Sequence, residues 1–208
     1  MTEPKQDRAV RKRAAILRAA AGVFDEYGFS GASISRIMDR AGSTQGGLYF
    51  HFKSKENLAQ AVMAGQREDL LMPSGEDGLQ HLIDITLYIS YELQHNVLLR
   101  AGVRLAVEQG SFGLQDDRAY RDWVGQFVVQ LVAARRRGEL LPGVDEEEYA
   151  TVLVSAYSGT QLFSQVSTGR ADLPRRIEAM WRYLLPGIAS AEVRSGLRID
   201  AARFAVRA

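Results

Sequence analysis

A short polar run at residues 43–47, Ser-Thr-Gln-Gly-Gly, has side chains suited to contacts with DNA. A Gln can pair bidentately with adenine, and a Thr can meet a thymine methyl or a phosphate. The glycines allow a backbone to come close to DNA, and Tyr, His and Lys donors that reach phosphates follow. The candidate DNA-binding residues are Ser43, Thr44, Gln45, Gly46, Tyr49, His51 and Lys55.

These residues must be held by short helices. Ser33 can cap a helix whose inward face carries Ile34 and Ile37, and Gly42 ends it. Ser43 or Thr44 can cap a second helix through about His51, and Ser54 a further helix from Lys55 to about Leu71. Two short helices joined by a Gly-containing turn predict a helix-turn-helix, with its inward side chains packed on Phe24. The alternative is a small three-helix core whose polar face is only solvated.

The charge of the chain is asymmetric. Residues 1–55 carry ten Lys or Arg and five Asp or Glu, a net +5, whereas residues 56–208 carry a net −4. A basic head on a mildly acidic body indicates a polyanionic partner for the head alone. Taken by itself this signal is weak, because basic N-termini are common.

The remaining sequence also reads as helices. Apolar residues recur every three or four positions, and Gly or Pro separates segments at roughly 77–94, 97–110, 117–137, 146–168 and 173–190. Leu48–Phe52 could pass for a strand, but no second β-run would pair with it. We therefore predict an all-α fold with a DNA-binding domain over 1–53 and a larger helical domain over 54–208. Residues 191–208 carry no interpretable motif.

Searches for catalytic and metal chemistry find nothing that argues for an enzyme. The chain has no Cys, and its three His residues form no metal-ligand spacing. Neither a phosphate-binding loop nor a nucleophile elbow is present. No catalytic residue, metal or cofactor is therefore expected. The charged N-terminus lacks the apolar stretch of a signal peptide, and no run is long enough to span a membrane. A cytoplasmic protein is the expectation.

Residues 12–62 resemble the DNA-binding domain of the TetR family of transcriptional regulators. The matching residues are Phe24 before Gly28, Ser33-Ile34-x-x-Ile37, Ala41-Gly42-Ser43, and Gly46-x-Leu48-Tyr49-x-His51-Phe52 with Lys55-x-x-Leu58. The run at 48–52 is similar to that of the actinobacterial γ-butyrolactone receptors, as is Leu99-Arg100-Ala101-Gly102-x-Arg104-Leu105-Ala106. The resemblance implies a two-domain homodimer that represses genes from double-stranded operator DNA until a small-molecule inducer binds. The family often has Lys where this chain has Gln45, which leaves the operator sequence open.

The second domain offers candidates for a ligand pocket, although an aromatic cluster among apolar helices is first of all a core. Thr160 and Gln161 interrupt an apolar helix and could supply polar groups. The resemblance places Trp123 over the ligand ring and Thr160 at the pocket wall, and Gln66 could reach the same cavity. Trp181 either touches the ligand or supports the pocket. The candidate ligand-binding residues are Trp123, Thr160, Gln66, Phe127, Phe163, Leu105, Val152 and Trp181.

Two helices, 146–168 and 173–190, carry more apolar and small residues than one buried face requires. Their expected use is an isologous dimer through a four-helix bundle, and the alternative is burial within the monomer. Two further functions stay open beside the hormone-type receptor. One is a multidrug or lipophilic-compound sensor of the same fold, and the other is a ligand-independent architectural DNA-binding protein.

Overall fold

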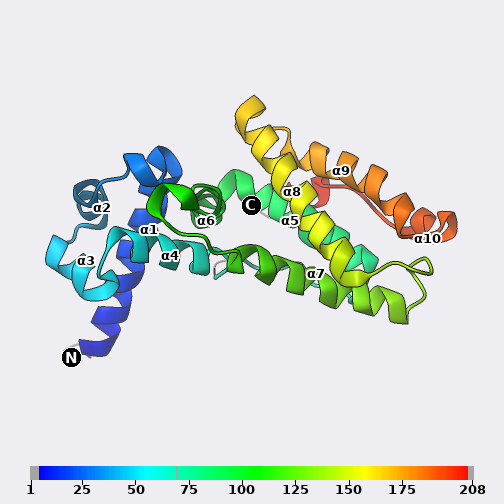
Figure 1. Cartoon of the computed structure of the whole chain (residues 1–208), viewed down its shortest axis with the longest axis horizontal. Helices are drawn as coiled ribbons and strands as arrows, with labels where there is room; N and C mark the ends of the chain where they lie inside the picture. The colour runs from blue at the N-terminus through cyan, green and yellow to red at the C-terminus, as the bar shows by residue number, and fades with distance from the viewer. Residues whose placement is uncertain (1–4, 69, 206–208) are drawn as a thin grey trace. The chain divides into compact units, whose positions relative to one another are not determined.

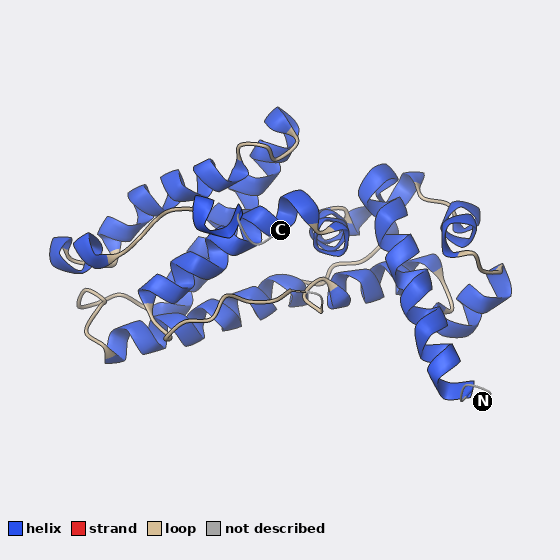
Figure 2. Ribbon diagram, turned by 180° about the vertical axis from the view of Figure 1, so that it is seen from behind, coloured by secondary structure: helices blue, strands red, loops and turns tan. Residues whose placement is uncertain are grey.

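The computed structural model describes residues 5–68 and 70–205, and every element in this part of the chain is a helix (Figures 1 and 2). The all-α prediction is confirmed. The run at Leu48–Phe52 is helical, as the lack of a pairing partner required. By packing, the chain divides into two compact units, one made of residues 1–70 and 96–119 and the other of 71–95 and 120–208.

The first unit contains α1 (Lys5–Gly31), α2 (Ile34–Ala41), α3 (Gln45–Phe52), α4 (Lys55–Gly65), α6 (Val97–Val107) and the short η1 (Gln109–Phe112). Its core is apolar and close-packed. Phe24, Ile37, Leu48 and Phe52 are buried there, and Ile34, which was also predicted to face inward, is partly buried against the same core. Helix α6 adds Leu98, Ala101 and Leu105 to the same core, so it packs as part of this unit.

The fourth helix differs from the sequence prediction. The helix expected to run from Lys55 to Leu71 ends at Gly65, and Gln66 begins a turn in which the Glu68 amide donates to the Gly65 carbonyl. A glycine at that point favours the turn over further helix. Helix α1 is interrupted at Gly28, where the backbone is left-handed, with φ 67°.

The second unit contains α5 (Leu79–His95), α7 (Arg118–Arg136), α8 (Glu146–Thr168), α9 (Leu173–Leu184), η2 (Leu185–Gly187), α10 (Ala191–Gly196) and α11 (Ala202–Ala205). Helix α5 runs through its core and packs on α9, which also packs on α8. The predicted helix 173–190 stops at Leu184 because Pro186 follows and a short 3-10 turn takes over. The functional boundary predicted between residues 53 and 54 stays a prediction, since packing divides the chain elsewhere.

Candidate functional site

The helix-turn-helix is fixed by its own capping residues. Ser33 Oγ accepts from the Arg36 amide at 3.2 Å and begins α2. Gly42 then takes the left-handed conformation, with φ 57°, that closes α2. Thr44 Oγ1 accepts from the Gly47 amide at 3.4 Å and begins α3. The Ser33 cap was predicted, and of the two candidates for the next cap, Ser43 and Thr44, it is Thr44 that begins α3. This part of the site therefore follows from local sequence.

Helix α3 presents an exposed face opposite its buried Leu48 and Phe52. Gln45, Gly46 and Tyr49 lie on that face, as predicted, and His51 is half-buried. Thr44 is exposed too, and its cap uses only an acceptor lone pair, so its hydroxyl hydrogen can still be donated.

Lys55 is placed differently from the expectation of an extended phosphate-seeking side chain. Its Nζ lies 4.3 Å from the centre of the Phe29 ring, a cation–π contact. Partial burial lowers the pKa of this amine, while the neighbouring Glu56 raises it. Its role in phosphate binding stays a prediction.

Sequence reasoning missed Phe50, which is 79% exposed on α3. Its ring meets His51 edge to face, with 5.0 Å between the ring centres. The helical period could have found it, because Phe50 follows Gly46 by four residues and therefore shares its face. Phe50 is a candidate for contact with a thymine methyl, because it is a large apolar side chain exposed on the helix that carries the predicted base contacts.

Lys12 was counted among the basic residues but given no role. A Cβ atom on Gly47 would lie 3.0 Å from Lys12 Nζ and 3.0 Å from Ser43 Oγ, so both groups converge on the start of α3. Ser43 Oγ is buried and has no hydrogen-bond partner within the described residues. The exposed Lys12 ammonium group beside the start of α3 is a candidate donor to a backbone phosphate. The Ser43 hydroxyl is covered in this structure, so the DNA contact predicted for Ser43 stays a prediction.

Helix α6 is joined to the end of α1 by a network of charges. Two guanidinium N–H groups of Arg100 donate to Asp25 Oδ2 at 2.9 and 2.8 Å. Arg104 donates to the Asp25 carbonyl and to Glu108 Oε1, both at 2.7 Å. Glu108 Oε2 in turn accepts from the Phe29 amide at 2.7 Å. These partly buried, charge-assisted bonds fix the orientation of α6 on the unit that carries α3.

Glycines permit two close approaches in this network. A Cβ on Gly28 would lie 2.7 Å from a guanidinium nitrogen of Arg104, where the backbone is also left-handed. A Cβ on Gly102 would lie 2.6 Å from the Cβ of Gln66, a residue just past the end of α4. The segment 99–106, singled out by resemblance alone, is therefore the part of α6 that packs against α1 and α4.

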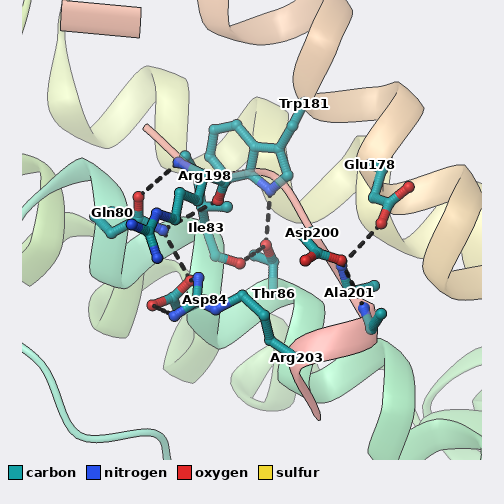
Figure 3. Close-up of polar contacts among 11 residues, drawn as sticks. Gln80, Ile83, Asp84, Thr86, Glu178, Trp181, Arg198, Asp200, Ala201 and Arg203 are labelled. Atoms are coloured by element: carbon teal, nitrogen blue, oxygen red, sulfur yellow. Dashed lines mark hydrogen bonds and ion pairs between the residues drawn. The ribbon is translucent and has the colours of Figure 1, made fainter. Parts of the chain in front are cut away.

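The predicted ligand residues are distributed over several places. Gln66 and Leu105 are buried in the first unit. In the second unit, Trp123 and Phe127 are neighbours on α7, with ring centres 6.1 Å apart. Trp181 is fully buried and its Nε1 donates to Thr86 Oγ1 at 2.7 Å (Figure 3), the geometry of a supporting residue.

The other three candidates lie on the outer side of the second unit. Thr160 and Phe163 line a shallow groove between α8 and α9 with a volume of about 560 Å³, whose lining includes neither tryptophan. Val152, 47% exposed, lines a separate hollow beside Tyr149. Gln161, the alternative polar group, is buried and accepts from the Arg170 guanidinium at 3.2 Å. The roles of these residues in ligand binding stay predictions.

Two negative findings concern the described residues, 5–68 and 70–205. No helix among them is long and apolar enough to cross a membrane. No group of three or more His, Asp or Glu side chains among them is arranged to hold a metal ion.

A capped helix-turn-helix and a second, helical unit define a class, the two-part bacterial transcriptional regulators. Comparison with known families places the chain within it. Residues 16–62 match the model of the bacterial regulatory proteins of the tetR family, and residues 76–190 match a tetracyclin repressor-like C-terminal domain. The chain belongs to the TetR family, and its relatives support a ligand-responsive repressor.

Three relatives show how close the similarity is. The A-factor receptor protein of Streptomyces griseus is 42% identical over 185 residues, which span 89% of this chain and 66% of that protein. A crystal structure of TylP, a TetR regulator from Streptomyces fradiae, has a TM-score of 0.84 and 39% identity, covering 95% of this chain and 96% of that one. A γ-butyrolactone receptor structure, ArpA-like, has a TM-score of 0.69 and 27% identity, covering 97% and 99%.

Proposed function

We propose that this chain acts as a homodimer that represses transcription from a pseudo-palindromic operator and is released by a small signalling molecule of γ-butyrolactone, butenolide or furan type. The observation that carries the proposal is that Arg100, Arg104 and Glu108 bind α6 to the end of α1. Both helices belong to the first unit, here called the DNA-reading unit because it carries α3. A helix held so firmly on α1 and α4 can report a change elsewhere in the chain to α3. The repressor would act in the cytoplasm, with no catalytic step and no cofactor.

DNA reading is assigned to the exposed face of α3. Gln45 supplies the amide that pairs with adenine, and Phe50 the apolar surface for a thymine methyl. Thr44, Tyr49 and His51 offer donors to the operator backbone. Lys12 holds a further phosphate at the start of α3, which helps to fix the angle at which the helix enters the major groove.

Dimerisation is assigned to the outer face of α8 and α9. Leu162, Phe163 and Val166 on α8 and Tyr183 on α9 are all exposed. Between these helices, Ala156 and Gly159 leave the shallow groove described above. Apolar side chains beside small residues suit close packing against the same face of a second copy. Two copies are needed because one helix-turn-helix alone binds a specific site weakly, whereas two read half-sites about one helical turn apart.

Ligand binding is assigned to the second unit, with Trp123 and Phe127 of α7 as an aromatic wall. The buried Trp181 supports the unit by holding α9 on Thr86 of α5. A flat lactone or furan ring can stack on an indole. The ligand would favour a state in which α4 is displaced and the two α3 helices no longer match both half-sites. It shifts this equilibrium only by its difference in affinity for the two states.

The experiment combines DNA binding with intrinsic fluorescence, since both tryptophans lie in the second unit. A gel shift uses DNA upstream of the protein's own gene, and a panel of synthetic 2-acyl-γ-butyrolactones is titrated in. Release of DNA together with quenching supports the proposal. Release only by lipophilic cations or dyes would favour a multidrug sensor. Intact DNA binding with no response to any compound would favour an architectural protein.

A further inference from the structure

The segment 197–205, here called the strap, follows α10 and lies across α5 and α9. Its backbone pairs with one side chain of α5, because the Arg198 amide donates to Gln80 Oε1 at 2.8 Å and Gln80 Nε2 donates to the Arg198 carbonyl at 3.1 Å. On the other side, the Ala201 amide donates to Glu178 Oε1 of α9 at 2.8 Å (Figure 3). The strap therefore joins two helices of the second unit.

An ion pair between the exposed Arg203 and the buried Asp84 strengthens the attachment. Arg203 donates to both carboxylate oxygens of Asp84, at 2.9 and 3.3 Å, and Gln80 Nε2 donates to the same carboxylate at 2.8 Å (Figure 3). Asp84 is only 8% exposed on a largely apolar stretch of α5. A buried carboxylate without its cation is costly, so the pair needs the strap in place.

The strap ends on an aromatic contact. Phe204 is buried, and its ring meets that of Tyr88 edge to face with 6.1 Å between the centres. Gln80, Asp84 and Tyr88 are spaced by four residues, so the strap follows one continuous stripe along α5. This spacing explains polar residues on a helix that is mostly buried.

Tyr88 has a second contact on its hydroxyl. Its Oη accepts from the Leu71 amide at 3.1 Å. The Leu71 side chain is exposed, so its own packing does not hold this part of the chain. Leu71 is also the first residue of the second unit after α4. A neighbouring tether joins the Pro73 carbonyl to His81 Nε2 at 3.1 Å and does not involve the strap.

We propose that Arg203 and Phe204 are positioning residues for the ligand response. They hold Tyr88 in the place where its hydroxyl fixes the chain at Leu71, so that movement of α5 pulls on the segment that follows α4. This role rests on the proposed function, because it concerns how ligand occupancy reaches the DNA-reading unit. It predicts that the strap affects ligand-driven release and leaves the unliganded complex with DNA intact.

The test compares Arg203→Ala and Phe204→Ala with Arg198→Ala in the full chain. Arg198→Ala removes the same charge within the strap but keeps the backbone atoms that Gln80 binds. The first measurement is hydrogen exchange at Leu71 without ligand. We expect exchange there to be at least about tenfold faster in both test variants and unchanged in the control, because the amide loses its fixed acceptor.

The second measurement is operator affinity with and without a 2-acyl-γ-butyrolactone that releases the wild-type protein. We expect the operator affinity of the unliganded variants to stay within about twofold of wild type. The ratio of operator affinity without lactone to that with lactone should fall at least about fivefold. Should Phe204→Ala fail to fold, Arg203→Ala carries the test, with the fluorescence of the two tryptophans as the check on folding. The proposal would be overturned if the Leu71 amide of both test variants exchanged at the wild-type rate. It would also be overturned if Arg198→Ala accelerated that exchange as much as they do. If no lactone acts on the wild type, the ligand class is wrong and the exchange data still decide about the strap.

Discussion

Gly102→Ala tests how tightly α4 and α6 are packed. The added Cβ would lie 2.6 Å from the Cβ of Gln66, whereas carbon atoms in contact prefer about 3.5–4.0 Å. The helices must separate by roughly 1 Å, and overpacking of this kind costs about 1–3 kcal/mol. The better helix propensity of Ala returns up to about 1 kcal/mol. The net loss in the free energy of unfolding should be about 1 kcal/mol.

Gly125→Ala on α7 is the matched control, since a Cβ there meets nothing within 4 Å. This variant should gain about 0.5–1 kcal/mol, because only helix propensity changes. Urea denaturation at one fixed protein concentration measures the free energy of unfolding of both variants. Gly102→Ala should also weaken operator binding in the absence of ligand by about fivefold or more, because it displaces α4 as the ligand is proposed to do.

The double variant Gly102→Ala/Gln66→Gly removes the atom that clashes and should recover operator affinity. Two results would refute the reasoning. One is equal stability gains for Gly102→Ala and Gly125→Ala. The other is an operator affinity of Gly102→Ala that matches the wild type while its stability falls.

Further predictions concern DNA, ligand and acid stability. Tyr49→Ala should weaken operator binding by about 1 kcal/mol without changing lactone affinity, and an unchanged gel shift would count against its assigned role. Lys12→Gln should make the plot of log affinity against log salt shallower by about 0.9 per half-site; the same slope as wild type would show that no phosphate is bound there. Trp123→Ala should keep operator binding and abolish release by lactone, whereas loss of both would make Trp123 structural. Asp172 has a pKa lowered to about 2, first by the Ser164 hydroxyl that donates to it at 2.6 Å. Its contribution to stability is therefore present above the ordinary pKa of 3.8 and lost as the pH falls toward 2. Asp172→Asn should flatten the pH dependence of the unfolding temperature in that window, and a slope equal to wild type would contradict this.

The helix-turn-helix could be predicted from the sequence because its determinants are local. Ser33, Gly42 and Thr44 cap or close helices within a few residues of themselves, and Leu48 and Phe52 follow the helical period. Phe50 follows the same period, so the exposed face predicted for α3 should have included it beside Gly46. The predicted fourth helix was too long because apolar periodicity continues past Gly65, where the backbone turns.

Long-range pairings could not be predicted. Arg100 and Asp25 are 75 residues apart, and nothing in either local pattern selects the other as partner. The same holds for Trp181, whose partner Thr86 lies 95 residues earlier. An amphipathic helix such as α6 shows that it packs, but its sequence does not say against which unit. The strap was uninterpretable for this reason, because Arg203 acquires meaning only beside Asp84, 119 residues away.

The central claim is that ligand occupancy of the second unit changes the separation of the two α3 helices in a dimer. The chain has no Cys, so a single Ser35→Cys on the exposed surface of α2 places one spin label in each protomer. Dipolar spectroscopy then gives the distance between labels with and without a releasing 2-acyl-γ-butyrolactone. The account predicts a shift of the distance distribution by more than about 3 Å. An unchanged distribution under conditions where the lactone frees the operator would contradict it.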